Sequence, residues 1–127
     1  MTAPTKPTEL VTRFCAAWST GDIDAIVEFF TDDAVYHNIP VAPVTGRDAI
    51  KATIAGFTAN VQSVEFRVNN LAANGNVVLT ERVDVFTFPN ATLELPVMGT
   101  FEIVDGRIAA WRDYFDLKQF TSQLPTS

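Results

Sequence analysis

Cysteine and histidine are nearly missing from this sequence, which contains one of each, Cys15 and His37. A single cysteine cannot close a disulfide bond within the chain, which is typical of a protein of the reducing cytoplasm. Zinc sites are built mainly from Cys and His side chains. With one of each residue type available, we expect no dedicated metal site.

Positive charge is also scarce, and long apolar runs are absent. The chain has nine scattered Lys and Arg residues and a net charge of −6 at pH 7. Nucleic acids and anionic membranes bind basic patches, so neither is an expected partner. No apolar run approaches the roughly 20 residues of a membrane span, and residues 1–7 lack the apolar core of a signal peptide.

The composition is otherwise that of one folded domain. The 127 residues are 47% hydrophobic and 19% charged, which is ordinary for a globular protein. A chain of this length buries roughly two thirds of its unfolded surface, which suffices for a core without disulfide bonds. We expect a single domain over residues 1–127, with residues 1–6 as a flexible lead.

Apolar residues recur at helical spacing in the first 60 residues and again near the C-terminus. Thr8 is the expected N-cap of the first helix, and Thr31–Asp33 is expected to break the second. The four expected helices span Thr8–Gly21, Asp22–Phe30, Ala49–Thr58 and Leu117–Gln123.

Alternating apolar and polar residues predict the strands, and Asn74-Gly75 and Asp105-Gly106 are two-residue hairpin signals. The expected strands are Val35–Asn38, one containing Val64–Val68, Thr80–Phe88, Leu93–Ile103, and Arg107–Asp116. The last four form an antiparallel meander. Helices segregated to one side of such a sheet give an α+β domain, in this case a cone with a pocket inside.

One strand carries an unusual combination of side chains. Strand side chains repeat every second residue, so Arg82 and Asp84 point the same way as Phe86. Charged groups beside apolar bulk are costly to bury unless they are paired. Asp113 is expected to share a face of the last strand with Ala109, Trp111 and Phe115, and if the two faces meet it would complete an Asp84–Arg82–Asp113 group. Two carboxylates around one cation suit acid–base work, although a purely structural ion-pair network remains an alternative.

Tyr36 and Asn38 share one face of the short strand, and His37 lies on the other. Phenol and amide groups are suited to holding a water molecule by hydrogen bonds, provided that this face lines the pocket. The alternative is a face that points to solvent. By the same parity His37 is expected to be a surface or structural histidine, and Cys15 is expected in the core.

Four segments resemble the limonene-1,2-epoxide hydrolase family. They are Glu81–Val85 (ERVDV), Trp111–Asp116 (WRDYFD), Tyr36–Pro40 (YHNIP) and Gly46–Ala49 (GRDA), within a match from about residue 8 to residue 120. The resemblance implies an NTF2-like cone, in which a curved mixed sheet packs against three to four helices. It also implies a homodimer that needs no cofactor and no metal.

The resemblance assigns a role to each polar residue. It implies that Asp113 is the general base, which takes a proton from a water also held by Tyr36 and Asn38. Asp84 would protonate the epoxide oxygen, and Arg82 would bridge the two carboxylates. The implied reaction adds water in one step to a small, largely apolar epoxide, cyclic or terpene-like, and gives a vicinal trans-diol.

The implied pocket wall includes Phe86, Leu95, Val97 and Phe115. Phe86 is bulkier than the aliphatic residue expected at its position, which leaves open whether limonene oxide is the best substrate.

Other proteins of this fold have other functions. A ketosteroid isomerase would need tyrosine at Phe14 and aspartate at Asn38 and near Gly99, so that reading is rejected. A SnoaL-type polyketide cyclase would use one aspartate, Asp113, and would not need Tyr36. A non-catalytic ligand-binding module is the third reading, and it leaves the charged group without a purpose.

Overall fold

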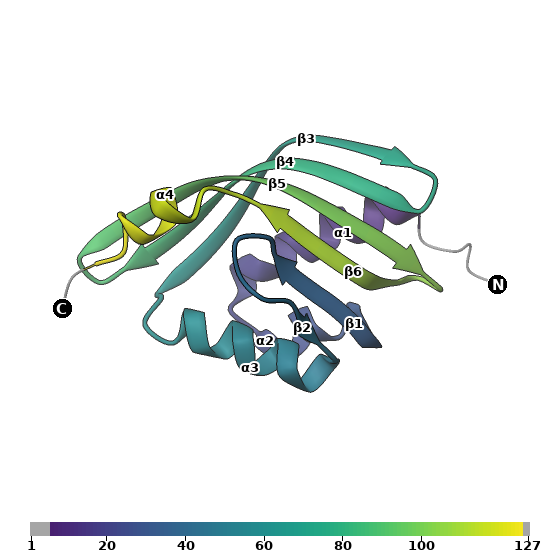
Figure 1. Cartoon of the computed structure of the whole chain (residues 1–127), viewed down its shortest axis with the longest axis horizontal. Helices are drawn as coiled ribbons and strands as arrows, with labels where there is room; N and C mark the ends of the chain where they lie inside the picture. Colours follow the sequence, from purple (N-terminus) through teal and green to yellow (C-terminus); the bar gives the residue numbers. More distant parts are fainter. Residues whose placement is uncertain (1–5, 126–127) are drawn as a thin grey trace.

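The computed structural model describes residues 6–125 and shows an α+β fold around one six-stranded sheet (Figure 1). Its strands are β1 (Phe30–Asn38), β2 (Val44–Thr45), β3 (Ser63–Asn74), β4 (Val77–Phe88), β5 (Ala91–Val104) and β6 (Arg107–Tyr114). The order across the sheet is β2-β1-β6-β5-β4-β3. The expected antiparallel meander of the last four strands is confirmed, and β1 joins it in parallel to β6, so the sheet is mixed.

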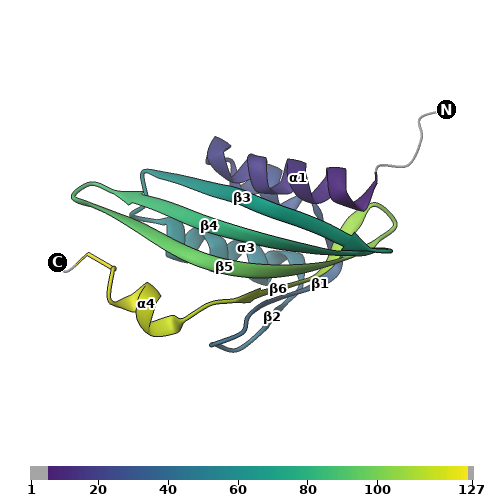
Figure 2. The same ribbon diagram turned by 90° about the horizontal axis from the view of Figure 1, so that it is seen from above.

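Helices cover one side of this sheet. They are α1 (Pro7–Ala17), the 3₁₀ turn η1 (Trp18–Thr20), α2 (Ile23–Val27), α3 (Arg47–Thr58) and α4 (Leu117–Thr121). The long strands arch over α2 and α3 in Figure 1, and Figure 2 shows α1 running alongside β3. No helix in residues 6–125 is long and apolar enough to cross a membrane.

The first helix starts earlier than expected. Lys6 is its N-cap and Pro7 occupies the first turn, so the expectation of a Thr8 cap is wrong. Proline suits this position because its fixed φ is already helical and its missing N–H would be unpaired there. Gly21, with a φ of 72°, ends the following 3₁₀ turn as expected. Of the lead expected over residues 1–6, only Lys6 lies within the described residues.

The second helix is shorter than expected, and the segment after it is a strand. Helix α2 ends at Val27, and Thr31–Asp33 belongs to β1 instead of forming a break. The extended conformation is stabilised by distant partners. Phe30 pairs with Ile108 of β6, and the Arg47 guanidinium donates to the Phe30 carbonyl at 2.6 Å.

A bulge interrupts the alternation of β6. Ile108 pairs with Ile103, whereas Ala110 pairs with Glu102, which leaves Ala109 as an extra residue. Ile108 therefore takes the buried position, and the expectation that Ala109 shares a face with Trp111 and Asp113 is wrong. Beyond the bulge, Trp111 and Asp113 are both buried on the helix side as expected.

The parallel pairing of β1 with β6 places the predicted polar residues side by side. Tyr36 is in register with Trp111, and Asn38 is in register with Asp113. Phe14 of α1 packs edge-on against the Trp111 ring, with the ring centroids 5.0 Å apart. The helices therefore pack onto the same sheet face that carries the charged residues.

Candidate active site

The centre of the site is the guanidinium of Arg82, which is 1% exposed. Its Nε and Nη2 donate to Oδ1 and Oδ2 of Asp84 at 2.9 and 2.8 Å. Its Nη1 and Nη2 donate to Oδ1 and Oδ2 of Asp113 at 3.2 and 2.8 Å. One arginine is therefore held between two carboxylates in two bidentate contacts, the strongest geometry for such a pair.

The rest of the network satisfies the remaining polar atoms. Nη1 of Arg82 also donates to the Thr80 hydroxyl at 3.1 Å, so all five guanidinium N–H groups have acceptors. The Trp111 indole N–H donates to Asp113 Oδ1 at 2.6 Å. The Phe66 ring lies 4.7 Å from the Arg82 Cζ atom and adds a cation–π contact. A fully satisfied network of this kind holds its members in one geometry.

Gly99 of β5 leaves the space that this network occupies. A Cβ atom at this position would lie 2.3 Å from Arg82 Nη1 and 2.7 Å from Asp113 Oδ1. Neither Gly99 nor Thr80 was identified from the sequence as part of the site. A glycine inside a strand is the signal that could have pointed to a close approach there.

Burial changes the acidity of the site. It raises the pKa of Asp84 to about 6, against the opposing effect of Arg82 and with a further increase from Asp113. Burial lowers the pKa of Arg82, but Asp113 and Asp84 outweigh it and hold that pKa well above its usual value. The arginine therefore stays charged, while Asp84 can carry a proton near neutral pH.

Both carboxylates open onto a cavity of about 160 Å³, which we call the carboxylate cavity. Its polar side chains are Tyr36, Asn38, Asp84 and Asp113, and Arg82 lies behind the carboxylates instead of on the wall. The apolar lining consists of Val41, Phe57, Phe66, Phe86, Leu95, Val97, Phe115, Leu117 and Phe120. The structure thus brings the four predicted polar groups and all four predicted wall residues to one cavity; their roles remain a prediction.

Fewer than half of the apolar wall residues were expected from the sequence. Phe57 and Phe66 were expected only as members of a helix and a strand. Leu117 and Phe120 were expected only as parts of the last helix. Val41 lies in the apolar, proline-containing segment Ile39–Val44 that follows β1, a composition that is compatible with a pocket wall.

Tyr36 is held at the back of this cavity. Its ring stacks on Trp111 with the centroids 4.3 Å apart and an angle of 10° between the planes. Burial, with a smaller effect of Asp113, raises the pKa of the Tyr36 hydroxyl far above its usual value, although a hydrogen bond with Asn38 opposes this. The hydroxyl therefore stays protonated and can donate to a bound water.

His37 and Cys15 lie outside the cavity wall. His37 does not line it, and its Nε2 lies 3.0 Å from the Val41 carbonyl oxygen. Cys15 is buried in the core, and burial raises the pKa of its thiol to about 12, which disfavours the reactive thiolate. No group of three or more His, Cys, Asp or Glu side chains within residues 6–125 is arranged to hold a metal ion.

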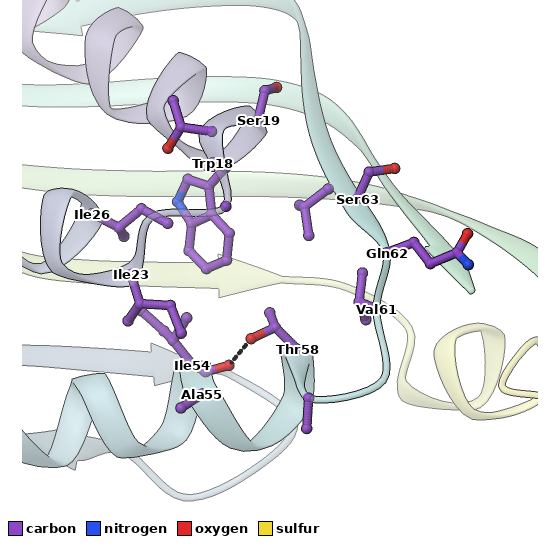
Figure 3. Close-up of a pocket in the computed structure, with 14 residues that line it drawn as sticks. Trp18, Ser19, Ile23, Ile26, Ile54, Ala55, Thr58, Val61, Gln62 and Ser63 are labelled. Carbon is purple, nitrogen blue, oxygen red and sulfur yellow. Dashed lines mark hydrogen bonds between the residues drawn. The ribbon is translucent and has the colours of Figure 1, made fainter. Parts of the chain in front are cut away.

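A larger cavity, of about 300 Å³, lies between α2, α3 and the start of β3, and we call it the Trp18 cavity (Figure 3). Its walls carry hydroxyl and amide groups but no titratable side chain. The Thr58 hydroxyl, for example, donates to the Ile54 carbonyl at 2.7 Å. Without an acid or a base this cavity is a poor candidate for the reaction centre.

Comparison with known proteins identifies the family. The family model of the limonene-1,2-epoxide hydrolase catalytic domain matches residues 5–126. Epoxide hydrolase EphG of Mycobacterium tuberculosis (strain ATCC 25618 / H37Rv) is 33% identical over 107 residues, which cover 84% of this chain and 71% of that protein.

Solved structures agree with this assignment. An M. tuberculosis LEH-like epoxide hydrolase matches with a TM-score of 0.82 at 30% identity, over 93% of this chain and 88% of that one. A protein named as a SnoaL-like polyketide cyclase, from Shewanella denitrificans OS-217, matches with a TM-score of 0.83 over 92% of this chain and 95% of that one. At 15% identity it shows the fold alone. The chain has the NTF2-like fold and belongs to the limonene-1,2-epoxide hydrolase family.

Proposed function

We propose that this protein hydrolyses a small, largely apolar epoxide, cyclic or terpene-like, to a vicinal trans-diol in one step, by general acid–base catalysis without a cofactor. The observation that carries the proposal is the pair of carboxylates, Asp84 and Asp113, bound to one buried guanidinium and facing one apolar cavity. Opening an epoxide needs a nucleophile at carbon and a proton at oxygen. An ionised carboxylate can activate water as the nucleophile, and a protonated carboxyl group can supply the proton.

Asp84 is the general acid in this mechanism. Its pKa of about 6 leaves a fraction of the group protonated at neutral pH, ready to donate to the epoxide oxygen. Asp113 is the general base and accepts a proton from the attacking water, which Tyr36 and Asn38 hold. Oδ1 of Asp113 already accepts N–H groups from Arg82 and Trp111, whereas Oδ2 accepts one, so Oδ2 has the freer lone pair for the water proton.

The charge balance explains why one arginine serves two carboxylates. With Asp84 protonated and Asp113 ionised, the pair carries one negative charge, which Arg82 neutralises. The reaction moves one proton from water to Asp113 and one from Asp84 to the epoxide oxygen. The pair still carries one negative charge afterwards, and a single proton transfer from Asp113 to Asp84 restores the starting state.

A covalent route is the mechanistic alternative. A nucleophilic aspartate would form an ester, whose hydrolysis needs a second base, commonly histidine. His37 does not line the carboxylate cavity. We therefore expect direct attack by water. In a single turnover in ¹⁸O-labelled water with enzyme in excess, the first diol should contain the label; label in an Asp84 or Asp113 peptide instead would establish the ester route.

The direct test of the function is diol formation from cyclohexene oxide by the purified protein, with and without excess EDTA. We expect equal rates, because the proposed site residues include no histidine or cysteine and because Asp84 and Asp113 are already engaged by Arg82. A SnoaL-type cyclase would need Asp113 alone and would leave the acidic proton of Asp84 unused. Absence of any diol from a panel of small epoxides would refute the proposed function.

Epoxide and water are the proposed small-molecule partners, and a second copy of the chain is the proposed protein partner. On the face of the sheet opposite the helices, Leu79, Met98 and Tyr114 are 44%, 50% and 47% exposed. Met98 pairs directly with Tyr114 across β5 and β6, so the side chains of Met98 and Tyr114 adjoin. Light scattering should give the mass of a homodimer, and Met98→Glu should shift it toward the monomer. The cytoplasm remains the predicted compartment.

A further inference from the structure

A third cavity adjoins the carboxylate cavity. This outer cavity has a volume of about 370 Å³ and shares three aromatic residues, Phe57, Phe86 and Phe120, with the carboxylate cavity. The same three rings therefore contribute to the walls of both spaces, and the two cavities are neighbours.

Beyond the three rings, the outer cavity is built from three separate segments. Its further lining consists of Gly56, Asn60 and Val61 at the end of α3, Phe88 at the end of β4, and Leu124 and Pro125 after α4. Figure 1 shows the end of the long β4–β5 hairpin close to α4 at one end of the molecule. Asn60 is the single polar side chain on this lining and no charged one is present, so the cavity favours an apolar occupant.

The size of the carboxylate cavity sets a limit on what it can hold alone. Ligand pockets commonly measure about 300–1,000 Å³, and this one measures about 160 Å³. Its four polar groups must also hold the epoxide oxygen and a water. The space suits the reacting ring and a small substituent, whereas the two cavities together fall within the usual range.

The partition between the cavities can open at modest cost. Phe57 and Phe120 are half-buried, and Phe57 meets Phe86 edge-on at a centroid distance of 6.1 Å. Helix α4, which carries Phe120, has five residues and none of them is buried. The Gln123 side chain ties the end of this segment to the backbone of β5, donating to the Glu94 carbonyl at 2.9 Å and accepting from the Glu94 N–H at 3.2 Å.

We propose that the outer cavity binds the apolar tail of an epoxide with an extended alkyl substituent, whose epoxide ring lies between Asp84 and Asp113. This inference rests on the proposed function and adds the class of substrate. The tail passes between the three phenylalanine rings and replaces water along the outer lining. Each fully buried methylene should raise kcat/KM up to about fourfold.

The test is a series of 1,2-epoxyalkanes from epoxybutane to epoxydecane, measured as kcat/KM below their solubility limits. Gly56→Trp is the informative variant, because an added Cβ at Gly56 meets no atom within 4 Å and the new ring would fill the outer cavity. Ala52→Trp is the matched control on the same helix, at an exposed position that lines neither cavity.

We expect epoxydecane to exceed epoxybutane by at least about tenfold in the wild-type protein and in Ala52→Trp. Gly56→Trp should lose this difference while it keeps the wild-type rate with epoxybutane. Turnover of the short epoxides without a gain for the long ones, or equal behaviour of the two tryptophan variants, would overturn this inference alone. Absence of turnover with every epoxide would instead refute the proposed function, and the inference with it.

Discussion

The Trp18 cavity is larger than the carboxylate cavity, but the carboxylate cavity is the one with acidic side chains on its wall. The Trp18 cavity is larger, at about 300 Å³ against about 160 Å³, yet no titratable side chain lines it. The smaller cavity has two buried carboxylates, held by an arginine that does not reach the cavity wall. We therefore expect the reactivity of this protein to depend on the buried network behind the cavity wall more than on the volume of the cavity.

The two tryptophans show the same contrast at the level of single atoms. The indole N–H of Trp111 donates to Asp113, whereas the buried indole N–H of Trp18 has no hydrogen-bond partner. A buried N–H donor without a hydrogen-bond partner costs free energy, whereas a hydrogen bond to a charged group favours the charged form of that group. Substitutions on the two sides of this contrast should therefore differ in effect, most strongly at the carboxylates and least at the tryptophans.

The largest effect is expected at the carboxylates. Asp113→Asn and Asp84→Asn should each lower kcat by about 100-fold or more, because each removes one proton-transfer group. Steady-state kinetics with cyclohexene oxide and a melting curve check this, with Ser63→Ala in the Trp18 cavity as the control. Retention of more than about a tenth of the wild-type rate by either variant would contradict the role assigned to that residue.

Gly99→Ala should disrupt the network and the fold together. The added methyl would overlap Arg82 and Asp113, and overpacking of this kind costs about 1–3 kcal/mol. We expect a melting temperature lower by several degrees and a large loss of activity. Gly56→Ala is the matched control, since its methyl meets no atom within 4 Å and should leave both properties unchanged or raise stability slightly. Equal stability of the two variants would show that the network can move aside.

The pH profile should report the proton on Asp84. Because burial raises its pKa from 3.8 to about 6, kcat/KM should fall as the pH rises above about 6. The same shift favours the folded state fully below pH 3.8, and this contribution is lost as the pH rises through about 6. Denaturant unfolding of the wild type and of Asp84→Asn checks the sign: the wild type should lose stability between pH 4 and 7 relative to the variant. The opposite trend would refute a raised pKa.

The smallest effect separates the two tryptophans. Trp111→Phe keeps an aromatic ring against Tyr36 but removes the donor to Asp113, so kcat should fall about tenfold with KM little changed. Trp18→Phe removes an unpaired N–H and should leave kcat unchanged. Equal kcat values of Trp111→Phe and Trp18→Phe would mean that Trp111 acts through packing alone.

Local pattern sufficed for much of the sheet. The alternation along β4 placed Thr80, Arg82, Asp84 and Phe86 on one face, and all four are buried there. The hairpin signals at Asn74-Gly75 and Asp105-Gly106 likewise lie at the turns between β3 and β4 and between β5 and β6. These predictions succeed because strand periodicity and turn conformation are properties of neighbouring residues.

Elements that depend on distant partners were predicted less well. The start of β1 at Phe30 depends on pairing with Ile108 and on a hydrogen bond from Arg47. The helix predicted from the preceding residues was therefore too long and ended at Phe30 instead of Val27. The bulge at Ala109 depends in the same way on the register between β5 and β6. Neither register is encoded in a local window.

The sequence by itself determined that Arg82 and Asp84 share a face beside apolar residues and therefore need partners, because a buried charge is costly alone. It also carried the family resemblance that assigned roles to Tyr36, Asn38 and Asp113. Only the tertiary structure decided that both carboxylates bind one guanidinium in bidentate contacts, that Gly99 leaves room for it, and that Phe57 and Phe120 line both the carboxylate cavity and the outer cavity. The reason is physical: these contacts join strands and helices that are far apart in the chain, and their geometry exists only when all of them have packed.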